Sequence, residues 1–423
     1  MNSDSRTLRR QAPLFAADGM RSFAMGYFSI VFVIVARRLG LSALGLGIVT
    51  GISVAAGIVI THLLTKLAHR YGARTPLGIS GVLMAGTGVV ISLAHSQGVL
   101  FMSAFLGVLP PSGGMFISAL VEGVLAQSPS ERRTAVFARN GVIAMVTGAA
   151  GALFASFPTL LGMSQVEGLK FLIWFYVGIG IAVAAVSFAV IDIAPVAGAR
   201  LPSGDESGSS PESQRFEHAS GSNAVIHRLS ILFILDSAGS GVVAPTLVVF
   251  WLRYHFSLGV VALSLLFFGM DVLSAISYPL AERISRKVGL LNTAVFTHIP
   301  SSLLLVAVPF APGALAACLL LLGRSLLVKM DVPTRQSYVA SVVTPESRRT
   351  AAAKTSMGRQ AGRSVGPAIG GFLLSNVSAT APFIASAVMK ISYDLILWRS
   401  FRATPFAEAA GTAPPLLGTR QEP

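Results

Sequence analysis

Long apolar runs with short polar breaks dominate the chain. Residues 75–121 contain no Asp, Glu, Lys or Arg, and residues 288–323 form a second charge-free run. Each is too long for one membrane-spanning helix, which needs roughly 20 apolar residues, and long enough for two. A polar turn at residues 95–98 divides the first run, and a Pro- and Gly-containing break at 309–313 divides the second. The pattern predicts an all-α protein with twelve membrane-spanning helices, near 15–37, 43–66, 75–95, 98–126, 134–160, 168–194, 227–253, 258–281, 289–310, 313–343, 350–375 and 379–399.

Composition supports a lipid environment. The 423 residues are 53% hydrophobic and 12% charged, and the mean hydropathy is +0.71. A soluble domain is about 25% charged, so this chain could not cover its surface in water. Cys318 is the single cysteine, which excludes an internal disulfide and a cysteine-based metal site.

Basic residues predict the orientation. The net charge is +14, and most Lys and Arg fall in alternate loops on the side of both termini. The opposite loops hold only Arg37, Arg38, Lys170 and Arg253. The positive-inside rule therefore predicts a multi-pass protein of the plasma (inner) membrane with both termini cytoplasmic. We attribute the positive charge to topology and anionic lipid, with no role in nucleic-acid binding.

The chain contains an internal repeat. A shift that carries Arg132 to Arg348 aligns Arg-Arg-Thr-Ala at 132–135 with the same four residues at 348–351. Each half then has six spans in the same orientation, which predicts two parallel bundles around a central cavity. A Ser-, Gly- and Pro-rich segment separates them. We predict an N-terminal bundle (1–194), a flexible cytoplasmic linker (195–226), a C-terminal bundle (227–400) and a cytoplasmic tail (401–423).

The loop after the second span carries a family motif. It reads Thr-Lys-Leu-Ala-His-Arg-Tyr-Gly-Ala-Arg at 65–74 and resembles the Gly-x-Leu-Ala-Asp-Arg-x-Gly-Arg-Arg motif of the major facilitator superfamily. Arg70, Gly72 and Arg74 match that motif, whereas Thr65 and His69 depart from it. A looser copy, which includes Arg283, lies at 280–289. The resemblance implies a monomeric secondary transporter that works by alternating access, with no enzymatic activity and no cofactor.

Two further stretches refine the resemblance. Gly362, Gly366, Pro367 and Gly370 look like the Gly-Pro motif of drug/proton antiporters, which belongs in the fifth span rather than the eleventh. The stretch 330–338 looks like bacterial members without an assigned substrate. The resemblance to the antiporter motif slightly favours proton-coupled efflux over uptake. A lipid flippase or a non-transporting receptor on the same fold stays an alternative.

Two buried charges are the leading site candidates. Arg324 lies about 16 Å below the outer end of the tenth span, near the bilayer centre. A guanidinium there can hold a carboxylate or phosphate through two hydrogen bonds, or it can pair permanently with Asp271. Burial favours the protonated form of a carboxyl group, so Asp271 is also the candidate for proton coupling.

The remaining candidates follow from charge and spacing. Intramembrane ionisable groups are costly and usually face protein or a cavity. Positive charge is in excess, which favours an anionic or amphipathic organic solute; no spacing predicts a metal site. Lys390 and Asp394 are four residues apart and predict a self-neutralising pair. Cavity candidates besides Asp271 and Arg324 are Arg21, Tyr27, Lys329, Arg359 and Arg363; gating candidates are Arg70, Gly72, Arg74, Arg283, Asp331 and Arg335; helix-packing candidates are Gly362, Gly366, Pro367 and Gly370.

Overall fold

The structure is a computed structural model that describes residues 3–110, 115–125, 130–189, 213–331 and 348–401. Within these ranges it is helical and contains no strand. The first half comprises α1 (Ser3–Arg38), α2 (Ala43–Tyr71), α3 (Arg74–Ser92), α4 (Gln97–Ala104), α5 (Met115–Leu125), α6 (Ser130–Phe154), α7 (Phe157–Leu160) and α8 (Gln165–Ser187). The second comprises α9 (Ser213–Val242), α10 (Pro245–His255), α11 (Val260–Val288), α12 (Leu290–Ala307), the 3-10 turn η1 (Val308–Phe310), α13 (Ala314–Val328), α15 (Arg348–Asn376) and α16 (Ala381–Phe401).

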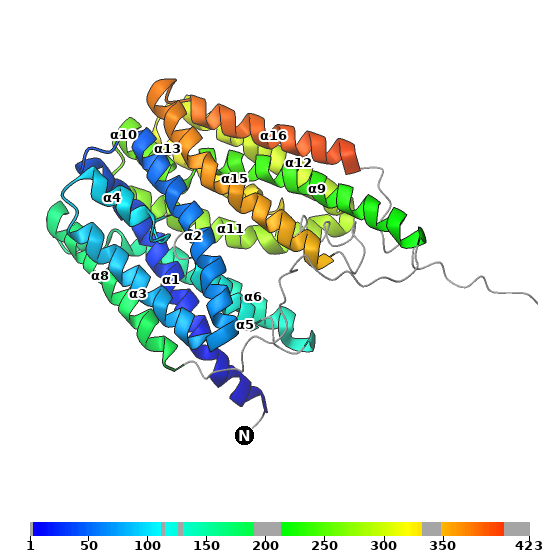
Figure 1. Cartoon of the computed structure of the whole chain (residues 1–423). Coiled ribbons are helices and arrows are strands. Elements are labelled where there is room, and N and C mark those ends of the chain that lie inside the picture. The colour runs from blue at the N-terminus through cyan, green and yellow to red at the C-terminus, as the bar shows by residue number, and fades with distance from the viewer. Residues whose placement is uncertain (1–2, 111–114, 126–129, 190–212, 332–347, 402–423) are drawn as a thin grey trace, which may run out of the picture.

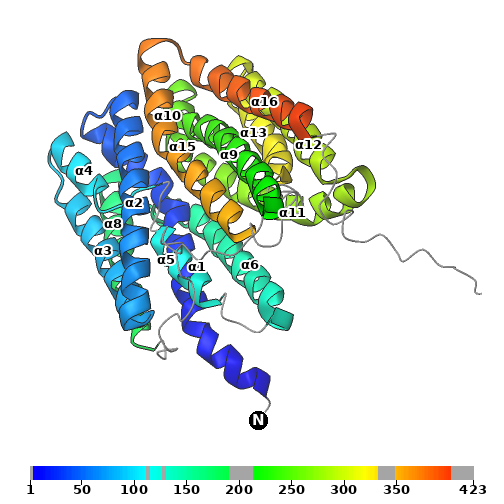
Figure 2. The same ribbon diagram turned by 45° about the vertical axis from the view of Figure 1, so that its right-hand side comes forward.

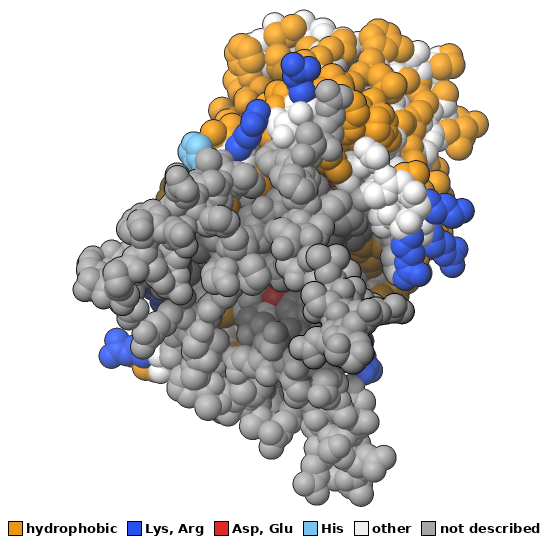
Figure 3. Space-filling view, turned by 90° about the vertical axis from the view of Figure 1, so that its right-hand side faces the viewer, with side chains coloured by type: hydrophobic (Ala, Val, Ile, Leu, Met, Phe, Trp, Pro, Cys, Tyr) orange, Lys and Arg blue, Asp and Glu red, His pale blue; other side chains and the backbone are white. Residues whose placement is uncertain are grey.

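The helices form two bundles, α1–α8 and α9–α16, which lie side by side (Figures 1 and 2). Each of the twelve predicted spans contains helix in the described residues. Eight helical stretches among those residues are long and apolar enough to cross a membrane. The other spans are short, interrupted or polar at one end; α15, for example, carries Arg359 and Arg363 within its length. On the face shown in Figure 3, Lys and Arg side chains lie at the edge of the apolar surface.

One predicted span is interrupted. The pattern predicts a continuous helix over 98–126, but α4 ends at Ala104 and α5 begins at Met115. Pro110 cannot donate a backbone hydrogen bond, and Gly107 has a φ of 65°. The Ser53 hydroxyl on α2 accepts from the Leu109 N–H at 3.1 Å and donates to the Leu109 carbonyl at 3.3 Å. A side chain thus satisfies backbone groups that lipid could not.

The second bundle also begins earlier than the apolar pattern indicates. Helix α9 starts at Ser213, within the segment predicted as linker, and continues into the predicted span at 227. Pro211 is the last proline before this helix, and the residues that follow contain no further helix breaker of that kind until Pro245. Residues 195–212 and the predicted tail beyond Phe401 lie outside the described residues.

The repeat is visible in the backbone at two glycines. Gly72, between α2 and α3, has φ 78° and ψ 173°, and Gly289, between α11 and α12, has φ 86° and ψ 160°. Only glycine populates this region readily. The glycine of the loop motif is therefore required by the turn in both halves.

A substitution at this turn gives a first testable prediction. Gly72→Ala is expected to lower the free energy of unfolding by about 1–3 kcal/mol, because alanine is strained at this φ and ψ. Gly259→Ala is the matched control: Gly259 has φ −72° and ψ 165°, which any residue adopts, and a Cβ there would meet nothing within 4 Å. The stability of both variants is measured as the melting temperature in detergent. Equal melting temperatures for Gly72→Ala and Gly259→Ala would contradict the prediction.

Small residues bring helices together within and between the bundles. A Cβ on Gly362, Gly366 or Gly370 of α15 would meet backbone atoms of α9, and a Cβ on Gly151 of α6 would meet the Phe23 carbonyl of α1. Between the bundles, α2 and α15 lie side by side (Figures 1 and 2). There a Cβ on Gly47 would meet the Pro367 carbonyl. Such contacts are typical of membrane helices, where packing is not driven by the hydrophobic effect.

Candidate functional site

A cavity of about 580 Å³ lies between the two bundles. Helices α1 and α6 line it on one side. Helices α9, α10, α11, α12, α13, α15 and α16 contribute residues on the other side. Pockets of about 300–1,000 Å³ are typical of sites for small organic molecules.

Charged side chains in the cavity come almost entirely from the C-terminal bundle. The N-terminal bundle contributes Arg21. Cations outnumber carboxylates: the lining includes Arg21, Arg324, Lys329, Arg363 and Lys390 against Asp236, Asp271 and Asp331. Arg21 is neutralised by Asp18, whose Oδ1 lies 2.8 Å from the arginine Nε. The lining of the cavity therefore carries more cationic than anionic side chains.

Arg324 on α13 is the central cation. Its Nε is buried and has no hydrogen-bond partner, although a guanidinium offers five N–H donors. Among the described residues no salt bridge joins Arg324 to Asp271; the carboxylate that acts electrostatically on the arginine is Asp236. Asp271 is instead acted on by Lys329. A buried donor without a partner is costly, so this nitrogen can gain from an acceptor in the cavity.

A second group of charges meets behind the cavity, and it corrects one prediction. Lys390 and Asp394 do not pair with each other. The Lys390 Nζ donates to Asp236 Oδ1 on α9 at 3.0 Å, and both Asp394 oxygens lie within 3.0 Å of the His298 Nδ1 on α12. Helices α9 and α12 both pack against α16, so tertiary partners replace the neighbour one turn away.

The N-terminal bundle contains a different arrangement at the equivalent helix. Asp18 on α1 accepts hydrogen bonds from Ser118 Oγ at 2.6 Å and Asn140 Nδ2 at 2.9 Å, as well as from Arg21. This carboxylate is saturated by its own bundle. Its counterpart in the C-terminal bundle, Asp236, accepts a hydrogen bond from Lys390 and also interacts electrostatically with Arg324.

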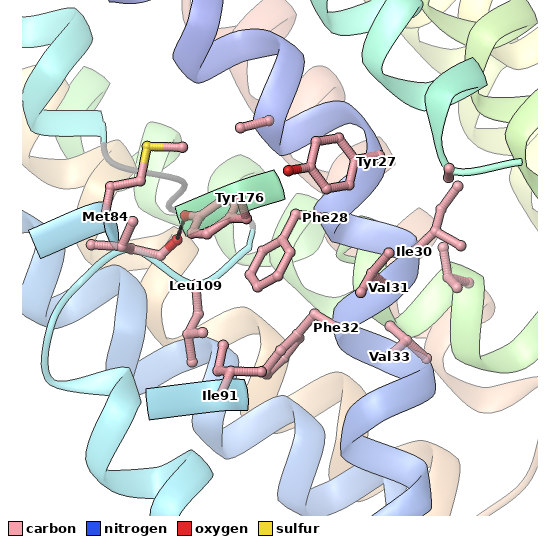
Figure 4. Packing of buried hydrophobic residues seen from close by; sticks show 14 of the residues in the cluster. Tyr27, Phe28, Ile30, Val31, Phe32, Val33, Met84, Ile91, Leu109 and Tyr176 are labelled. Carbon is pink, nitrogen blue, oxygen red and sulfur yellow. Dashed lines mark hydrogen bonds between the residues drawn. The ribbon is translucent and has the colours of Figure 1, made fainter. Parts of the chain in front are cut away.

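Two predicted cavity residues lie elsewhere. Tyr27 is fully buried and points toward the aromatic core of the N-terminal bundle, where its neighbour Phe28 stacks on Tyr176 at 4.1 Å (Figure 4). Arg359 places its guanidinium 5.6 Å from the centre of the Phe233 ring on α9. Neither side chain lines the cavity.

The predicted gating residues are distributed between loop and cavity. Arg70 lies over Tyr71 and Arg74 over Phe188, at 5.3 and 5.0 Å from the ring centres, and Arg283 is exposed. Asp331 is buried and lines the cavity. Arg335 lies outside the described residues.

The sequence analysis missed His298. It lies in a run without Asp, Glu, Lys or Arg, so a search for formal charges passes over it. A histidine inside a membrane span is itself an ionisable group that calls for a partner. That signal could have identified it, but not its contact with Asp394, which is 96 residues away in the chain.

The fold and sequence agree with a known family. Residues 229–416 match the sequence model of the Major Facilitator Superfamily. A variant of the nucleoside transporter NupG superposes with a TM-score of 0.72 at 12% identity, over 93% of this chain and 99% of that one. The second half of the chain thus matches the superfamily in sequence, and the whole chain matches NupG in fold. A bacterial homolog of the human lysosomal transporter Spinster, in an inward-facing and occupied conformation, gives 0.72 at 14% identity, over 96% and 100%.

A curated relative spans the same length. The uncharacterized membrane protein YJR124C of Saccharomyces cerevisiae is 23% identical over 413 residues, which cover 91% of this chain and 92% of that protein. The resemblance is thus not restricted to bacterial proteins. The superpositions confirm the twelve-helix, two-bundle fold, and eight helical stretches of the described residues are long and apolar enough for a multi-pass membrane protein.

Proposed function

We propose that this protein is a secondary active transporter of the major facilitator superfamily, driven by protons, and that it carries a small organic anion or an anionic amphipathic solute. The observation that carries the proposal is Arg324, a cavity-lining guanidinium with a buried Nε that has no partner. Lys329 and Arg363 line the same cavity and add positive charge. A carboxylate or phosphate can accept two parallel hydrogen bonds from an arginine, which supplies both affinity and orientation.

The cavity also suits alternating access. It lies between two bundles that touch through small residues, where Gly47 of α2 meets Pro367 of α15. Such a seam lets two rigid bundles rock about a central site. The sequence predicts efflux by proton antiport, and this prediction rests on the resemblance of the glycine pattern around Gly366 to an antiporter motif. Close packing against α9 already explains why residue 366 is a glycine. The direction of transport therefore stays a prediction, which a flux assay can test.

The proposal is tested by binding first and flux second. Purified protein in mild detergent is heated with a panel of organic anions, lipophilic cations, sugars and amino acids. A ligand that binds the native state raises the melting temperature. We expect stabilisation by members of the anion class. Stabilisation by cations alone would overturn the proposal.

Flux then separates transport from the alternative functions. Proteoliposomes with an imposed pH gradient are loaded with the stabilising anion, and its movement is followed together with internal pH. Solute movement that reverses with the gradient is expected, and the sign of the proton flux gives the direction of coupling. Binding without flux would indicate a receptor, and movement of labelled phospholipid without movement of the anion would indicate a flippase.

A further inference from the structure

The direction of each helix determines where along the cavity its lining residues lie. Helices α1 and α10 end side by side, where the Arg37 guanidinium lies 5.4 Å from the centre of the Tyr254 ring. This end, which we call the distal end, lies away from the N-terminus (Figures 1 and 2). Helix α11 begins there because it follows α10 directly, α12 returns to it, and α13 starts from it again.

The polarity of the lining changes along this direction. On α12, His298 and Leu305 both line the cavity, and Leu305 lies about 10 Å nearer the distal end. On α13, Leu321 lies on the distal side of Arg324 and Lys329. The charged residue of each helix is thus followed, toward the distal end, by an apolar one.

The same order occurs in three further elements. The pairs, each written with the charged residue first and the distal apolar residue second, are Asp271 and Phe267 on α11, Asp236 and Val248 on α9 and α10, and Arg21 and Met25 on α1. Ser29 is a polar residue on the distal side, but its hydroxyl donates to the Met25 carbonyl of its own helix at 2.8 Å. The gradient therefore comes from both bundles.

Five apolar side chains form what we call the distal chamber. Phe267 is half-buried, and the other four are at most 9% exposed. All five line the cavity, and they come from α10, α11, α12, α13 and the residue between α9 and α10. They are Val243, Val248, Phe267, Leu305 and Leu321.

Contacts between the bundles lie next to this chamber. The hydroxyl oxygens of Thr50 on α2 and Thr246 on α10 are 3.5 Å apart, and both residues are fully buried. Further toward the distal end, Arg37 lies over the rings of Phe250 and Tyr254. These contacts limit the length of an occupant in the distal direction.

The two parts of the cavity call for different chemistry in one molecule. A charged group in the distal chamber would lose its hydration without gaining a partner, which is costly. An apolar group beside Arg324 would leave the buried Nε of that side chain without an acceptor. A molecule with an anionic group at one end and an apolar group at the other satisfies both parts.

We propose that the solute is an amphiphile with a single anionic head group, a carboxylate or a phosphate, which binds with its head at Arg324 and its apolar tail in the distal chamber. The charge of the head rests on the proposed function. The tail, its orientation and the residues that select its length go beyond that function. Because the chamber is bounded, affinity is expected to rise with tail length up to a maximum and then to fall.

The test compares matched ligands on the full-length protein in one detergent. Dissociation constants from thermal shifts are measured for straight-chain monocarboxylates from butyrate to decanoate, for alkyl phosphates of the same lengths, and for dicarboxylates with a charge at each end. Each added methylene is expected to strengthen binding about two- to fourfold until the chamber is full. A dicarboxylate should bind at least about tenfold more weakly than the monocarboxylate of equal length. The comparison of carboxylates with phosphates identifies the preferred head.

Substitutions then separate head from tail. Arg324→Ala should weaken the binding of acids of every length by a similar factor. Leu305→Ser should weaken long acids about tenfold and leave butyrate unchanged. Leu303→Ser is the matched control, because Leu303 lies on the same helix, is 57% exposed and does not line the cavity. Phe267→Ala, at a half-buried position, enlarges the chamber and should move the maximum to a longer tail.

The outcomes distinguish the tail from the charge. Anions that bind with affinities independent of tail length, or dicarboxylates that bind as tightly as monocarboxylates, would overturn the amphiphile proposal and leave the anion proposal standing. Equal effects of Leu305→Ser and Leu303→Ser, together with an unmoved maximum in Phe267→Ala, would show that the tail does not reach the chamber. If alkylammonium ions bind and no carboxylate or phosphate does, the anion proposal fails and the amphiphile proposal with it.

Discussion

Arg324→Ala is expected to weaken the binding of a stabilising organic anion by about 10- to 100-fold. The guanidinium lines the cavity and its Nε has no partner in the protein. A hydrogen bond to a charged group contributes about 1.5–3 kcal/mol, and 1.4 kcal/mol corresponds to a tenfold change in affinity. Arg324→Lys should recover part of the loss, because it keeps the charge but not the planar pair of donors.

The measurement is the dissociation constant from thermal shifts over a range of anion concentrations, with initial transport rates in proteoliposomes beside it. Arg359→Ala is the matched control, since Arg359 is an arginine of the same bundle that packs over Phe233 and does not line the cavity. If the two alanine variants lose affinity equally, the effect is one of overall charge. If neither does, Arg324 is structural and the anion proposal fails.

Gly366→Ala is expected to lower the free energy of unfolding by about 1–3 kcal/mol, the range found for overpacked interiors. Its Cβ would collide with the Ala238 carbonyl and the Gly241 backbone on α9. Backbone atoms cannot move aside as the end of a flexible side chain can. The two helices would have to separate along their seam, and other contacts of α15 with α9 would loosen with them.

Gly86→Ala supplies the comparison. Gly86 lies within α3, and a Cβ there would meet nothing within 4 Å. The Gly86→Ala protein should therefore be as stable as the wild type or more stable by up to about 1 kcal/mol, because alanine is the better helix former. The stability of both variants is measured as the melting temperature and as the fraction of protein that remains monodisperse after heating. A Gly366→Ala protein as stable as the wild type would mean that α9 and α15 are not in intimate contact.

The sequence predicted the architecture because the bilayer imposes simple rules. Apolar runs of limited length, polar breaks and the loop arginines were enough for twelve spans and a parallel repeat. The depth of Arg324 in the membrane was predicted from helix rise alone and stays a prediction; the structure places this side chain in the lining of the cavity. The interruption at Gly107 and Pro110 was missed because the surrounding residues are apolar, so hydropathy does not distinguish a broken helix from a continuous one.

Partners of the buried charges could not be predicted in the same way. Local spacing suggested that Lys390 pairs with Asp394, but the side chains point to different neighbouring helices, where Asp236 and His298 lie. Which helices surround α16, and at what rotation, depends on packing between segments far apart in the chain. Similarly, Tyr27 was predicted to line the cavity, but its ring packs against Phe23, Phe28 and Phe154 in the aromatic core of its own bundle.

The concentration of cavity charge in one bundle has a consequence for how such a chain can diverge. The second half of the internal repeat contributes most of the charged side chains that line the cavity, whereas the first half contributes Arg21 and a largely uncharged wall. Inherited changes in solute preference are then expected to accumulate in the second half of the gene. The first half is expected to tolerate more substitutions, provided that its small residues keep the surface that contacts the C-terminal bundle.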